Sequence, residues 1–349
     1  MRAILAPHGL GRGEWRTAFA GADHHGESAA RGFPEPLRPR TTGRKVAVPN
    51  GTTRRAVFAT VAALAVGTGV SCASTEDGAS STAERESDVG EYAAEFERLE
   101  QEFDARLGVY ARDTGTDAEV THRADERFAY ASTFKPLACA AVLERRSMAE
   151  MEETVTFGSE ELVEYSPITE ERVDTGMTLV EVCDAALRHS DNTAANLLFA
   201  ELGGPEGLQE ALEELGDDVT RVEREETALN EAEPGDIRDT TTPEAFAANL
   251  EKYVLGDTLP EGKRALLREM MVGNTTGDDL IRAGVPEEWE VGDKTGSPGY
   301  GGRNDIAVVW PADGEPIVLA VMSSRDEEDA EYDDALVAEA TEVAVDALG

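Results

Sequence analysis

Four short segments carry side chains that could act together on a carbonyl compound. In chain order they are Ser132-Thr133-Phe134-Lys135, Ser190-Asp191-Asn192, Glu226-Thr227-Ala228-Leu229-Asn230 and Lys294-Thr295-Gly296. A serine becomes a nucleophile when a neighbouring amine or carboxylate takes its proton, and the set contains both kinds of base. Ser and Lys stand three residues apart on many helices, so the four segments in this order, rather than any one of them, indicate nucleophilic catalysis.

Ser132 is expected to open a helix over residues 132–143. Backbone N–H groups at a helix N-terminus, together with the helix dipole, favour an oxyanion there. Lys135 lies one turn later on the same face, so its ammonium could lower the pKa of the hydroxyl, or its neutral amine could take the proton. Taken alone, Ser132 could also be a helix N-cap.

The second and third segments could supply proton transfer and water activation. Ser190 could relay a proton to a leaving nitrogen, and Asn192 could donate its amide to a substrate carbonyl, although Ser-Asp-Asn alone is also a common turn or helix cap. Glu226 could activate a water that Asn230, four residues later, also holds. On its own, Glu226 is one acid among 71.

Over about residues 90–349, the four segments resemble the class A serine β-lactamases, which carry SxxK, SDN and KTG motifs. The resemblance implies hydrolysis of the β-lactam ring of penicillins and cephalosporins through an acyl-Ser132 intermediate, and hence β-lactam resistance. Either Lys135 or Glu226 acting through water would be the base for acylation, and Glu226 with Asn230 would direct the deacylating water. No cofactor and no metal is implied.

The same resemblance assigns further roles around the motifs. The N–H groups of Ser132 and Ser297 would form the oxyanion hole. Asp191 would brace its loop, and Arg224 would pair with Asp239 to clamp the ends of the Glu226 loop. The residues expected to bind substrate are Asn192, Lys294, Thr295, Gly296, Ser297, Arg303 and Tyr165.

Two residues next to these motifs depart from the family's usual pattern. Pro298 follows Ser297 where a small residue is usual, and Gly302 precedes Arg303 where Thr or Ser is common. Both border the region expected to hold the substrate's side chain, so they leave the substrate preference open and the mechanism intact.

Two other functions share part of this pattern. Peptidoglycan carboxypeptidases and transpeptidases have the SxxK, SxN and KTG motifs but lack the loop around Glu226. A non-catalytic penicillin sensor stays acylated, so it would lack a competent Glu226, and it is usually tethered by transmembrane helices. Turnover of a chromogenic cephalosporin would distinguish hydrolysis from trapping.

Histidine and cysteine are both scarce. His122 and His189 are the only histidines after residue 71, so a zinc hydrolase is not expected. Cys139 and Cys183 are the only cysteines after Cys72. An even pair in an exported protein indicates a disulfide, and the matching positions pair in many class A enzymes. The alternative is two free, buried thiols.

Charge is divided unevenly along the chain. Residues 1–71 contain 10 basic and 4 acidic residues, whereas the remainder contains 22 basic and 67 acidic residues. Nucleic acids and anionic membranes repel such an acidic body, so neither is expected as a partner. The composition favours a folded, salt-tolerant protein with an acidic surface. We expect a monomer whose partner is a small-molecule β-lactam.

The first 71 residues are expected to be a leader with an export signal. Arg54-Arg55 precedes the apolar run Ala56–Val66, which is typical of a secretory signal and resembles the twin-arginine type. Val70-Ser71-Cys72 resembles a lipoprotein processing site, so the enzyme would be secreted or lipid-anchored at Cys72 on the outer face of the membrane. Residues 1–45 could be an upstream extension. The polar residues 72–89 indicate a flexible linker.

Strand patterns occur at both ends of the remaining chain, and helical patterns occupy the middle. The stripe Tyr92, Phe96, Leu99, Phe103 and Leu107 predicts a helix that Gly108 ends, before a strand at 109–111. A strand hairpin over 306–322 and a helix over 336–347 are expected near the C-terminus.

This order predicts an α/β plus all-α fold of the β-lactamase/transpeptidase type. An antiparallel sheet of about five strands, flanked by helices, would be built from both ends of the chain. We expect an α/β domain at 90–128 and 273–349, and an inserted helical domain at 129–272 that carries the nucleophile and the Glu226 loop.

Overall fold

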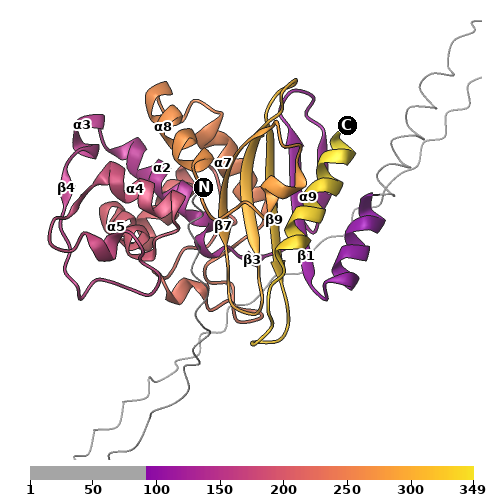
Figure 1. Ribbon diagram of the computed structural model, residues 1–349, viewed down its shortest axis with the longest axis horizontal. Helices are drawn as coiled ribbons and strands as arrows, with labels where there is room; N and C mark the ends of the chain where they lie inside the picture. The colour runs from indigo at the N-terminus through magenta and orange to yellow at the C-terminus, as the bar shows by residue number, and fades with distance from the viewer. Residues whose placement is uncertain (1–91) are drawn as a thin grey trace, which may run out of the picture. The chain divides into compact units, whose positions relative to one another are not determined.

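A five-stranded antiparallel sheet lies at the centre of the chain in this computed structural model, which describes residues 92–349 (Figure 1). The strand order is β2-β1-β9-β8-β7. The strands come from both ends of the described chain, as the sequence predicts: β1 (Arg106–Asp113), β2 (Glu119–His122), β7 (Glu290–Gly296), β8 (Asn304–Trp310) and β9 (Ile317–Ser324). The predicted fold class is therefore confirmed. The leader, the linker and Cys72 lie outside the described residues.

The neighbouring internal strands β8 and β9 are apolar on both faces. Val308 of β8 pairs with Val318 of β9, and Ala307 pairs with Leu319. All four side chains are fully buried. A strand that is covered on both faces has a nearly continuous apolar sequence, which is why the sequence identifies this hairpin so well.

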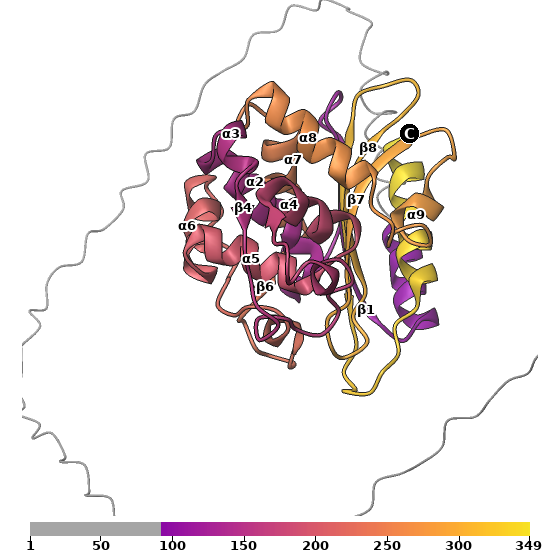
Figure 2. The same ribbon diagram turned by 60° about the vertical axis from the view of Figure 1, so that its left-hand side comes forward.

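Helices cover both faces of the sheet, as the two views show (Figure 2). On one face, Leu336 and Ala340 of α9 (Asp334–Leu348) and Phe96 of the helix at 92–102 pack against buried strand residues such as Val109 and Leu319. On the other face, β9 presents Val318, Ala320 and Met322 to the helices of the middle segment. The sheet thus separates two hydrophobic cores.

The middle segment is mostly helical and supplies the second layer. It contains four short strands and several helical turns besides its main helices. Their bounds are β3 (Phe128–Ala129), η1 (Ala131–Phe134), α2 (Lys135–Arg145), α3 (Met148–Met151), β4 (Thr154–Val155), η2 (Thr169–Glu171), β5 (Met177–Thr178), α4 (Leu179–Arg188), α5 (Asn192–Leu202), α6 (Pro205–Glu214), η3 (Ala228–Asn230), β6 (Thr240–Thr241), α7 (Pro243–Val254), α8 (Glu261–Val272) and η4 (Ile281–Gly284).

The first predicted helix is shorter than its apolar stripe suggests. The helix ends at residue 102, and Leu107 and Gly108 belong to β1. Leu107 fits the helical period only by coincidence. Its side chain is buried because β1 pairs with β9. Gly108 is needed inside the strand: a Cβ at this position would lie 2.4 Å from Cε2 of Phe128. The glycine allows close packing and does not end the helix.

Cys139 of α2 and Cys183 of α4 are both free thiols in this structure, so the predicted disulfide is not formed in it. Both residues are fully buried. Burial raises the pKa of the Cys139 thiol well above its ordinary value, and a hydrogen bond with Cys183 adds to this shift. The two thiols are therefore neighbours inside the helical layer.

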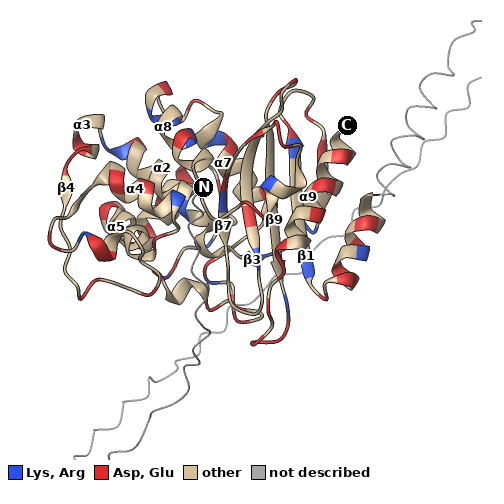
Figure 3. Cartoon of the chain, viewed as in Figure 1, with Lys and Arg blue, Asp and Glu red and all other residues tan. Residues whose placement is uncertain are grey.

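The described residues fall within a single compact unit. The division into an α/β domain (90–128 and 273–349) and a helical domain (129–272) therefore stays a prediction. Across residues 92–349, no helix is long and apolar enough to cross a membrane. Asp and Glu positions are distributed along the helices and loops of the described chain (Figure 3).

Candidate active site

The predicted site residues meet at a cleft of about 370 Å³ between the helical layer and the edge strand β7. Lys294, Thr295 and Gly296 lie at the end of β7, which is an edge strand of the sheet. The cleft is lined by Ser132, Tyr165, Ser190, Asn192, Asn230, Thr276, Thr295, Gly296, Ser297, Arg303 and Tyr332. Lys135, Glu226 and Lys294 are buried behind this lining.

Ser132 lies in the tight turn η1, and Lys135 is the first residue of α2. The helix that the sequence predicts over 132–143 thus begins with a 3₁₀ turn and extends to Arg145. Pro136 at the second position of α2 suits a helix start, because its missing N–H would have no partner there. Ser132 makes no N-cap bond and instead donates its hydroxyl to Glu226 Oε1, at 3.3 Å.

Lys135 is fully buried, and oxygen atoms surround its ammonium. Nζ donates to Ser190 O at 2.8 Å and to Asn192 Oδ1 at 2.7 Å, and it lies 3.2 Å from Glu226 Oε1. Burial lowers the pKa of Lys135, and the negative charge of Glu226 opposes that shift. The amine is therefore easier to deprotonate than an exposed lysine, and it adjoins both carboxylate and nucleophile.

Asp191 holds the loop that precedes α5. Its carboxylate accepts bonds from the backbone N–H groups of Ile168 (2.9 Å) and Thr169 (2.9 Å), and it caps α5 through the N–H of Ala194 (2.8 Å). The carboxylate thus ties the loop at 166–169 to the helix start. This contact places Ser190 and Asn192 on either side of Asp191 and toward the cleft.

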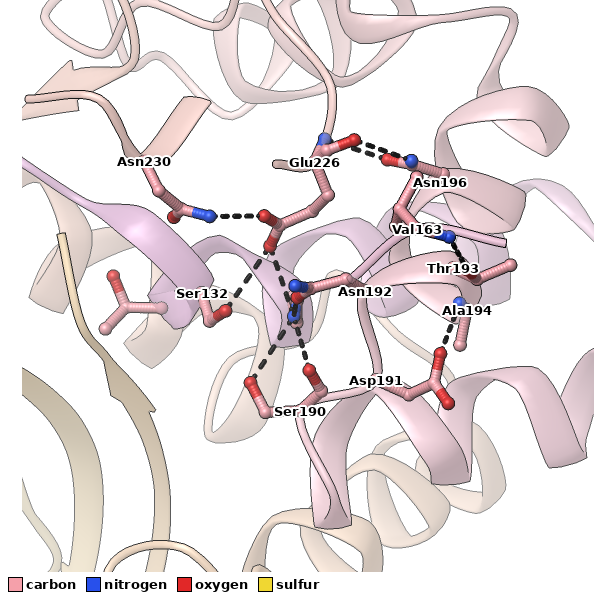
Figure 4. A network of polar contacts seen from close by, with 12 residues as sticks. Ser132, Val163, Ser190, Asp191, Asn192, Thr193, Ala194, Asn196, Glu226 and Asn230 are labelled. Atoms are coloured by element: carbon pink, nitrogen blue, oxygen red, sulfur yellow. Dashed lines mark hydrogen bonds and ion pairs between the residues drawn. The ribbon is translucent and has the colours of Figure 1, made fainter. Parts of the chain in front are cut away.

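Glu226 contacts both the nucleophile Ser132 and Asn230, the residue expected to hold the deacylating water with it (Figure 4). Its Oε2 accepts from Asn230 Nδ2 at 2.6 Å, while its Oε1 faces Ser132 and Lys135. Asn196 of α5 holds the backbone of Glu226 by two bonds of 2.9 Å, one to its carbonyl oxygen and one from its N–H. Contacts therefore hold Glu226 both at its carboxylate and at its backbone.

The predicted clamp at the ends of the Glu226 loop is an ion pair. Arg224 Nε lies 2.5 Å from Asp239 Oδ2, and the Asp239 side chain is fully buried. The other oxygen of Asp239 accepts from the N–H of Glu223 (2.9 Å), from the N–H of Arg224 (3.0 Å) and from the Tyr130 hydroxyl (3.1 Å). One carboxylate thus joins both ends of the loop to the start of η1.

Lys294 reaches from β7 to the hydroxyl of Ser190, at 3.0 Å. Burial, together with the positive charge of Lys135, lowers the pKa of Lys294 to about 7. Ser190 Oγ also lies 3.3 Å from Lys135 Nζ, so the hydroxyl stands between two ammonium groups. Protons can move along this line from Lys135 or Lys294 to a group in the cleft.

Gly296 lets β7 approach the nucleophile. A Cβ at this position would lie 2.8 Å from Tyr130 O and 3.4 Å from Ser132 N. Any side chain would push the strand away from the η1 turn. The glycine therefore brings the backbone of Ser297 near that of Ser132, which is the arrangement that a two-donor oxyanion hole needs.

Arg303 is held on three sides. Its Nε lies 2.5 Å from Asp334 Oδ1, its terminal N–H donates to Ser297 Oγ at 2.6 Å, and its guanidinium carbon lies 4.8 Å from the centre of the Tyr332 ring. In a strongly acidic protein, Lys135, Lys294 and Arg303 gather three cations at one cleft. This local positive charge favours an anionic substrate.

The two departures from the family pattern pack against each other. A Cβ on Gly302 would lie 2.4 Å from Pro298 Cγ, so the proline ring occupies the space of a side chain at 302. The N–H of Gly299, next to Pro298, donates to Asn230 O at 2.8 Å. The Pro298–Gly302 turn thus connects the end of β7 with the Glu226 loop.

Four residues around the site have left-handed backbones, although none is glycine: Ala131 (φ 45°), Tyr165 (φ 62°), Ser190 (φ 56°) and Asp239 (φ 54°). Such conformations are costly and persist where surrounding contacts impose them. Three of the four are predicted site residues, and Ala131 adjoins Ser132.

The structure adds four residues that the sequence analysis did not assign to the site: Asn196, Thr276, Tyr332 and Asp334. Asn196 could have been found, because it lies four residues after Asn192 and so shares its helix face. Thr276 lies in the loop after α8, and its hydroxyl oxygen lies 2.6 Å from that of Thr295. Tyr332 and Asp334 lie in an acidic run, and no sequence signal separates them from their neighbours. Within residues 92–349, no group of three or more His, Cys, Asp or Glu could hold a metal ion.

Residues 91–348 match the family described as the beta-lactamase enzyme family. A beta-lactamase of Amycolatopsis lactamdurans is 58% identical over 255 residues, which cover 73% of this chain and 84% of that protein. A beta-lactamase of Bacillus licheniformis is 52% identical over 277 residues, which cover 79% of this chain and 90% of that protein.

Solved structures give the same result. The crystal structure of a halotolerant bacterial beta-lactamase is 59% identical with a TM-score of 0.72, covering 73% of this chain and 98% of that one. The class A beta-lactamase from Clostridium kluyveri is 49% identical with a TM-score of 0.73, covering 74% of this chain and 98% of that one.

Proposed function

The chain belongs to the beta-lactamase enzyme family and is a class A β-lactam hydrolase that confers β-lactam resistance, and we propose that it works through an acyl-enzyme intermediate on Ser132. The observation that supports this mechanism is the position of Glu226. Its carboxylate contacts Ser132 Oγ, Lys135 Nζ and Asn230 Nδ2 at once. The Glu226 carboxylate can therefore act both when Ser132 attacks the substrate and when water later hydrolyses the acyl-enzyme.

In the acylation step, Ser132 Oγ attacks the carbonyl carbon of the β-lactam ring and the C–N bond of the amide breaks. The serine proton passes to Lys135 as the neutral amine, or to Glu226 through a water, and both remain candidates for this base. Ser190 delivers a proton to the ring nitrogen as it leaves, because its hydroxyl adjoins both Lys135 and Lys294. The products of this step are an ester on Ser132 and a free ring amine.

The negative charge that forms on the carbonyl oxygen is stabilised by the N–H groups of Ser132 and Ser297. Preorganised donors of this kind are worth about 3–4 kcal/mol each. Arg303, Lys294 and the Thr295 hydroxyl hold the substrate carboxylate, since a guanidinium suits it by paired hydrogen bonds. Asn192 and Tyr165 contact the remainder of the substrate.

Deacylation uses Glu226 as the general base for a water that attacks the ester on Ser132. Asn230 Oδ1 is buried and has no hydrogen-bond partner among the described residues, so it offers this water an acceptor beside the carboxylate. The ester C–O bond breaks, the proton returns to Ser132, and penicilloic acid or its cephalosporin equivalent is released.

Turnover of a chromogenic cephalosporin by purified protein tests this mechanism. We expect many turnovers per enzyme, and none from Ser132→Ala. A single stoichiometric burst from the unmodified protein would instead indicate a penicillin sensor. Release of D-alanine from a peptidoglycan pentapeptide at a higher rate than β-lactam hydrolysis would indicate a carboxypeptidase.

We also propose that the enzyme is an exported monomer. The supporting sequence features are Arg54-Arg55 with its apolar run and Cys72 within Val70-Ser71-Cys72. Cell fractionation distinguishes the two forms of export: Cys72→Ala should move activity from the membrane to the medium if Cys72 is lipidated, and Arg54→Lys with Arg55→Lys should retain activity in the cell if the twin-arginine route is used.

In an oxidising compartment, Cys139 and Cys183 should form the disulfide that is absent from this structure. Their contact inside the helical layer supports this proposal, since the thiols are already neighbours. A bridge across 44 residues would stabilise the fold by about 3–4 kcal/mol in the chain-entropy treatment. Thiol labelling of denatured, unreduced exported protein measures it: labelling of both cysteines would rule the bridge out.

A further inference from the structure

The hydroxyl of Thr295 has a single hydrogen-bond partner within residues 92–349, the hydroxyl of Thr276. Both residues line the substrate cleft, and their hydroxyl oxygens lie 2.6 Å apart. At this distance a hydrogen lies between the two oxygens, and either hydroxyl could donate it. The direction of this bond decides whether Thr295 has a hydrogen to offer a substrate.

Asn274, in the loop after α8, presents a known atom to Thr276. Its Nδ2 donates to Asp293 Oδ2 at 2.5 Å, and the other oxygen of Asp293 accepts from Arg282 Nε at 2.7 Å. Its Oδ1 accepts from the backbone N–H of Thr276 at 3.1 Å. A backbone N–H can only donate, so the oxygen of the amide, and not its nitrogen, faces Thr276.

This amide oxygen fixes the direction of both hydroxyl bonds. Asn274 Oδ1 lies 2.9 Å from the hydroxyl oxygen of Thr276, and an amide oxygen has no hydrogen, so Thr276 donates in this contact. A hydroxyl has one hydrogen, and Thr276 therefore accepts from Thr295 in the other contact. The bonds form a relay that runs from Thr295 to Thr276 and from Thr276 to Asn274.

The relay has no hydrogen left for a ligand. Two hydroxyl hydrogens serve two oxygen–oxygen contacts in the free enzyme. A substrate carboxylate beside Thr295 adds a third contact, and an ionised carboxylate can only accept. If Thr295 turns its hydrogen to the carboxylate, the Thr276 hydrogen must turn to Thr295 and leave Asn274. One contact therefore loses its hydrogen whichever way the relay points.

We propose that Thr276 is a positioning residue that competes with the substrate carboxylate for the hydrogen of Thr295, and that it thereby weakens the binding of carboxylate-bearing β-lactams. Lys294 and Arg303 are the donors that hold the carboxylate in the first place, and Thr295 adds to them only when the relay reverses. The inference rests on the proposed carboxylate site at Arg303. It predicts that removal of a polar group from the cleft strengthens binding.

Binding to a Ser132→Ala enzyme measures this effect without chemistry, because that variant has no nucleophile to acylate. The ligands are benzylpenicillin and its methyl ester, which lacks the negative charge. We expect Thr276→Val, which keeps the shape of threonine, to lower the Kd of benzylpenicillin about three- to tenfold, the equivalent of one hydrogen bond, and to change the Kd of the ester by less than about twofold. Thr276→Ser keeps the hydroxyl and should restore the Kd of benzylpenicillin.

Thr295→Val tests whether the two hydroxyls are coupled. In the Ser132→Ala enzyme it should raise the Kd of benzylpenicillin by less than about twofold, because the lost relay bond already offsets the contact with the carboxylate. Added to Thr276→Val, it should raise Kd about three- to tenfold, because Thr295 then donates freely. Thr275→Val is the matched control: this hydroxyl donates to Arg188 O at 2.7 Å, away from the cleft lining, and its loss should leave both Kd values unchanged.

Neutron diffraction from the unmodified free enzyme tests the relay without any variant. The deuterium of the Thr295 hydroxyl should lie on the line to Thr276 Oγ1, and that of Thr276 on the line to Asn274 Oδ1. A Thr295 deuterium directed into the cleft would overturn the proposal.

The binding outcomes are distinct. A higher Kd for benzylpenicillin in Thr276→Val would mean that Thr276 supports the carboxylate contact and would overturn the proposal, as would an unchanged Kd or equal changes for the acid and the ester. Failure of the proposed carboxylate site would appear differently: the Ser132→Ala enzyme would then bind acid and ester equally, and Arg303→Ala would change neither Kd.

Discussion

The groups that acylate and the groups that deacylate are held in different ways. Ser132 lies in η1, Lys135 is the first residue of α2, and Lys294 lies within β7. The Glu226 loop, residues 223–239, contains only the three-residue helical turn η3. Acylation therefore depends on regular elements, and deacylation depends on a loop.

The forces that hold the two regions differ as well. The residues that follow Ser132, such as Phe134 and Leu137, are buried in the larger core. The Glu226 loop buries Leu229 in the same core, but its ends and its catalytic segment are held by polar contacts, through Asn196, the Arg224–Asp239 pair and Gly299. Substitutions of polar residues should therefore damage deacylation before they damage acylation, and each prediction below tests this difference.

Glu226→Ala should have the largest effect. Loss of the general base should slow release of the acyl group by about 10²- to 10⁴-fold, while acylation continues at least in part because Lys135 remains. Mass spectrometry after exposure to penicillin should find a persistent adduct on Ser132. The matched control is Glu225→Ala, an exposed neighbour that should behave as the unmodified enzyme does. Turnover at the normal rate by Glu226→Ala would end the assignment.

Asp239→Asn should have the next largest effect. Arg224 would lose its partner, and breaking a buried pair costs about 3–5 kcal/mol, toward the lower end here because Arg224 keeps some exposure. The loosened loop should misplace Glu226, slow deacylation and favour bulky substrates over small penicillins, which steady-state kinetics on both classes would measure.

The control for this variant lies in the same loop. Asp236 forms a more exposed pair with Arg238 at 2.6 Å, so Asp236→Asn should cost no more than about 1 kcal/mol. If a folded Asp239→Asn enzyme keeps the normal substrate preference, the ion pair does not position Glu226.

Lys294 offers a test of the acylation region through pH. Its pKa is about 7, below the ordinary value, because the side chain is buried next to Lys135. The amine loses its charge as pH rises through that value, so kcat/KM should fall by up to about tenfold per pH unit as the substrate carboxylate loses a partner. In Lys294→Arg the charge persists, and this decline should disappear. An unchanged decline in Lys294→Arg would assign it to another group.

The stability contribution of Lys294 has the opposite sign. The unfolded chain keeps this lysine protonated up to about pH 10.4, while the folded chain releases the proton above about pH 7. The unfolded state binds more protons in this interval, so the contribution of Lys294 to folding stability rises with pH there. The contributions of Lys294 to activity and to folding stability should therefore change in opposite directions between pH 7 and 10.

The sequence predicts best what regular elements position. The β8–β9 hairpin and α9 follow from apolar periodicity, because burial of their side chains is what that periodicity records. The grouping of Ser132, Lys135, Ser190 and Glu226 follows from motif order by resemblance to a known family. Their contacts, such as the shared oxygen of Glu226, come only from the structure.

The features that the sequence predicts wrongly, or does not reveal, have physical causes. Leu107 fits a helical period, but pairing between β1 and β9 determines its structure. Tyr332 and Asp334 approach Arg303 from the β9–α9 connection, and the packing of distant segments leaves no periodic trace. Pro298 and Gly302 look like two separate departures in the sequence, whereas the ring of one fills the space beside the other.

Salt should have the smallest effect, and it should act on the two regions differently. After residue 71 the chain has 67 acidic and only 22 basic residues, so like charges repel across a compact body. The Debye length is about 30 Å at 0.01 M salt and about 3 Å at 1 M, so added salt removes most of this repulsion. Unfolding separates the charges, which means that low salt favours the unfolded state.

We therefore expect the thermal midpoint to rise steeply from 0.01 M NaCl and to level off toward 2 M, by about 2–4 °C for each 1 kcal/mol gained at this chain length. The acylation rate should depend little on salt, because Lys135 and Lys294 are fully buried. Glu231 and Glu233 are exposed on the Glu226 loop, so deacylation should slow first at low salt. Single-turnover and steady-state kinetics at each salt concentration separate the two steps. A midpoint that stays level or falls over the first tenfold increase in salt would refute the role given to charge, and equal slowing of both steps would contradict the contrast between loop and core.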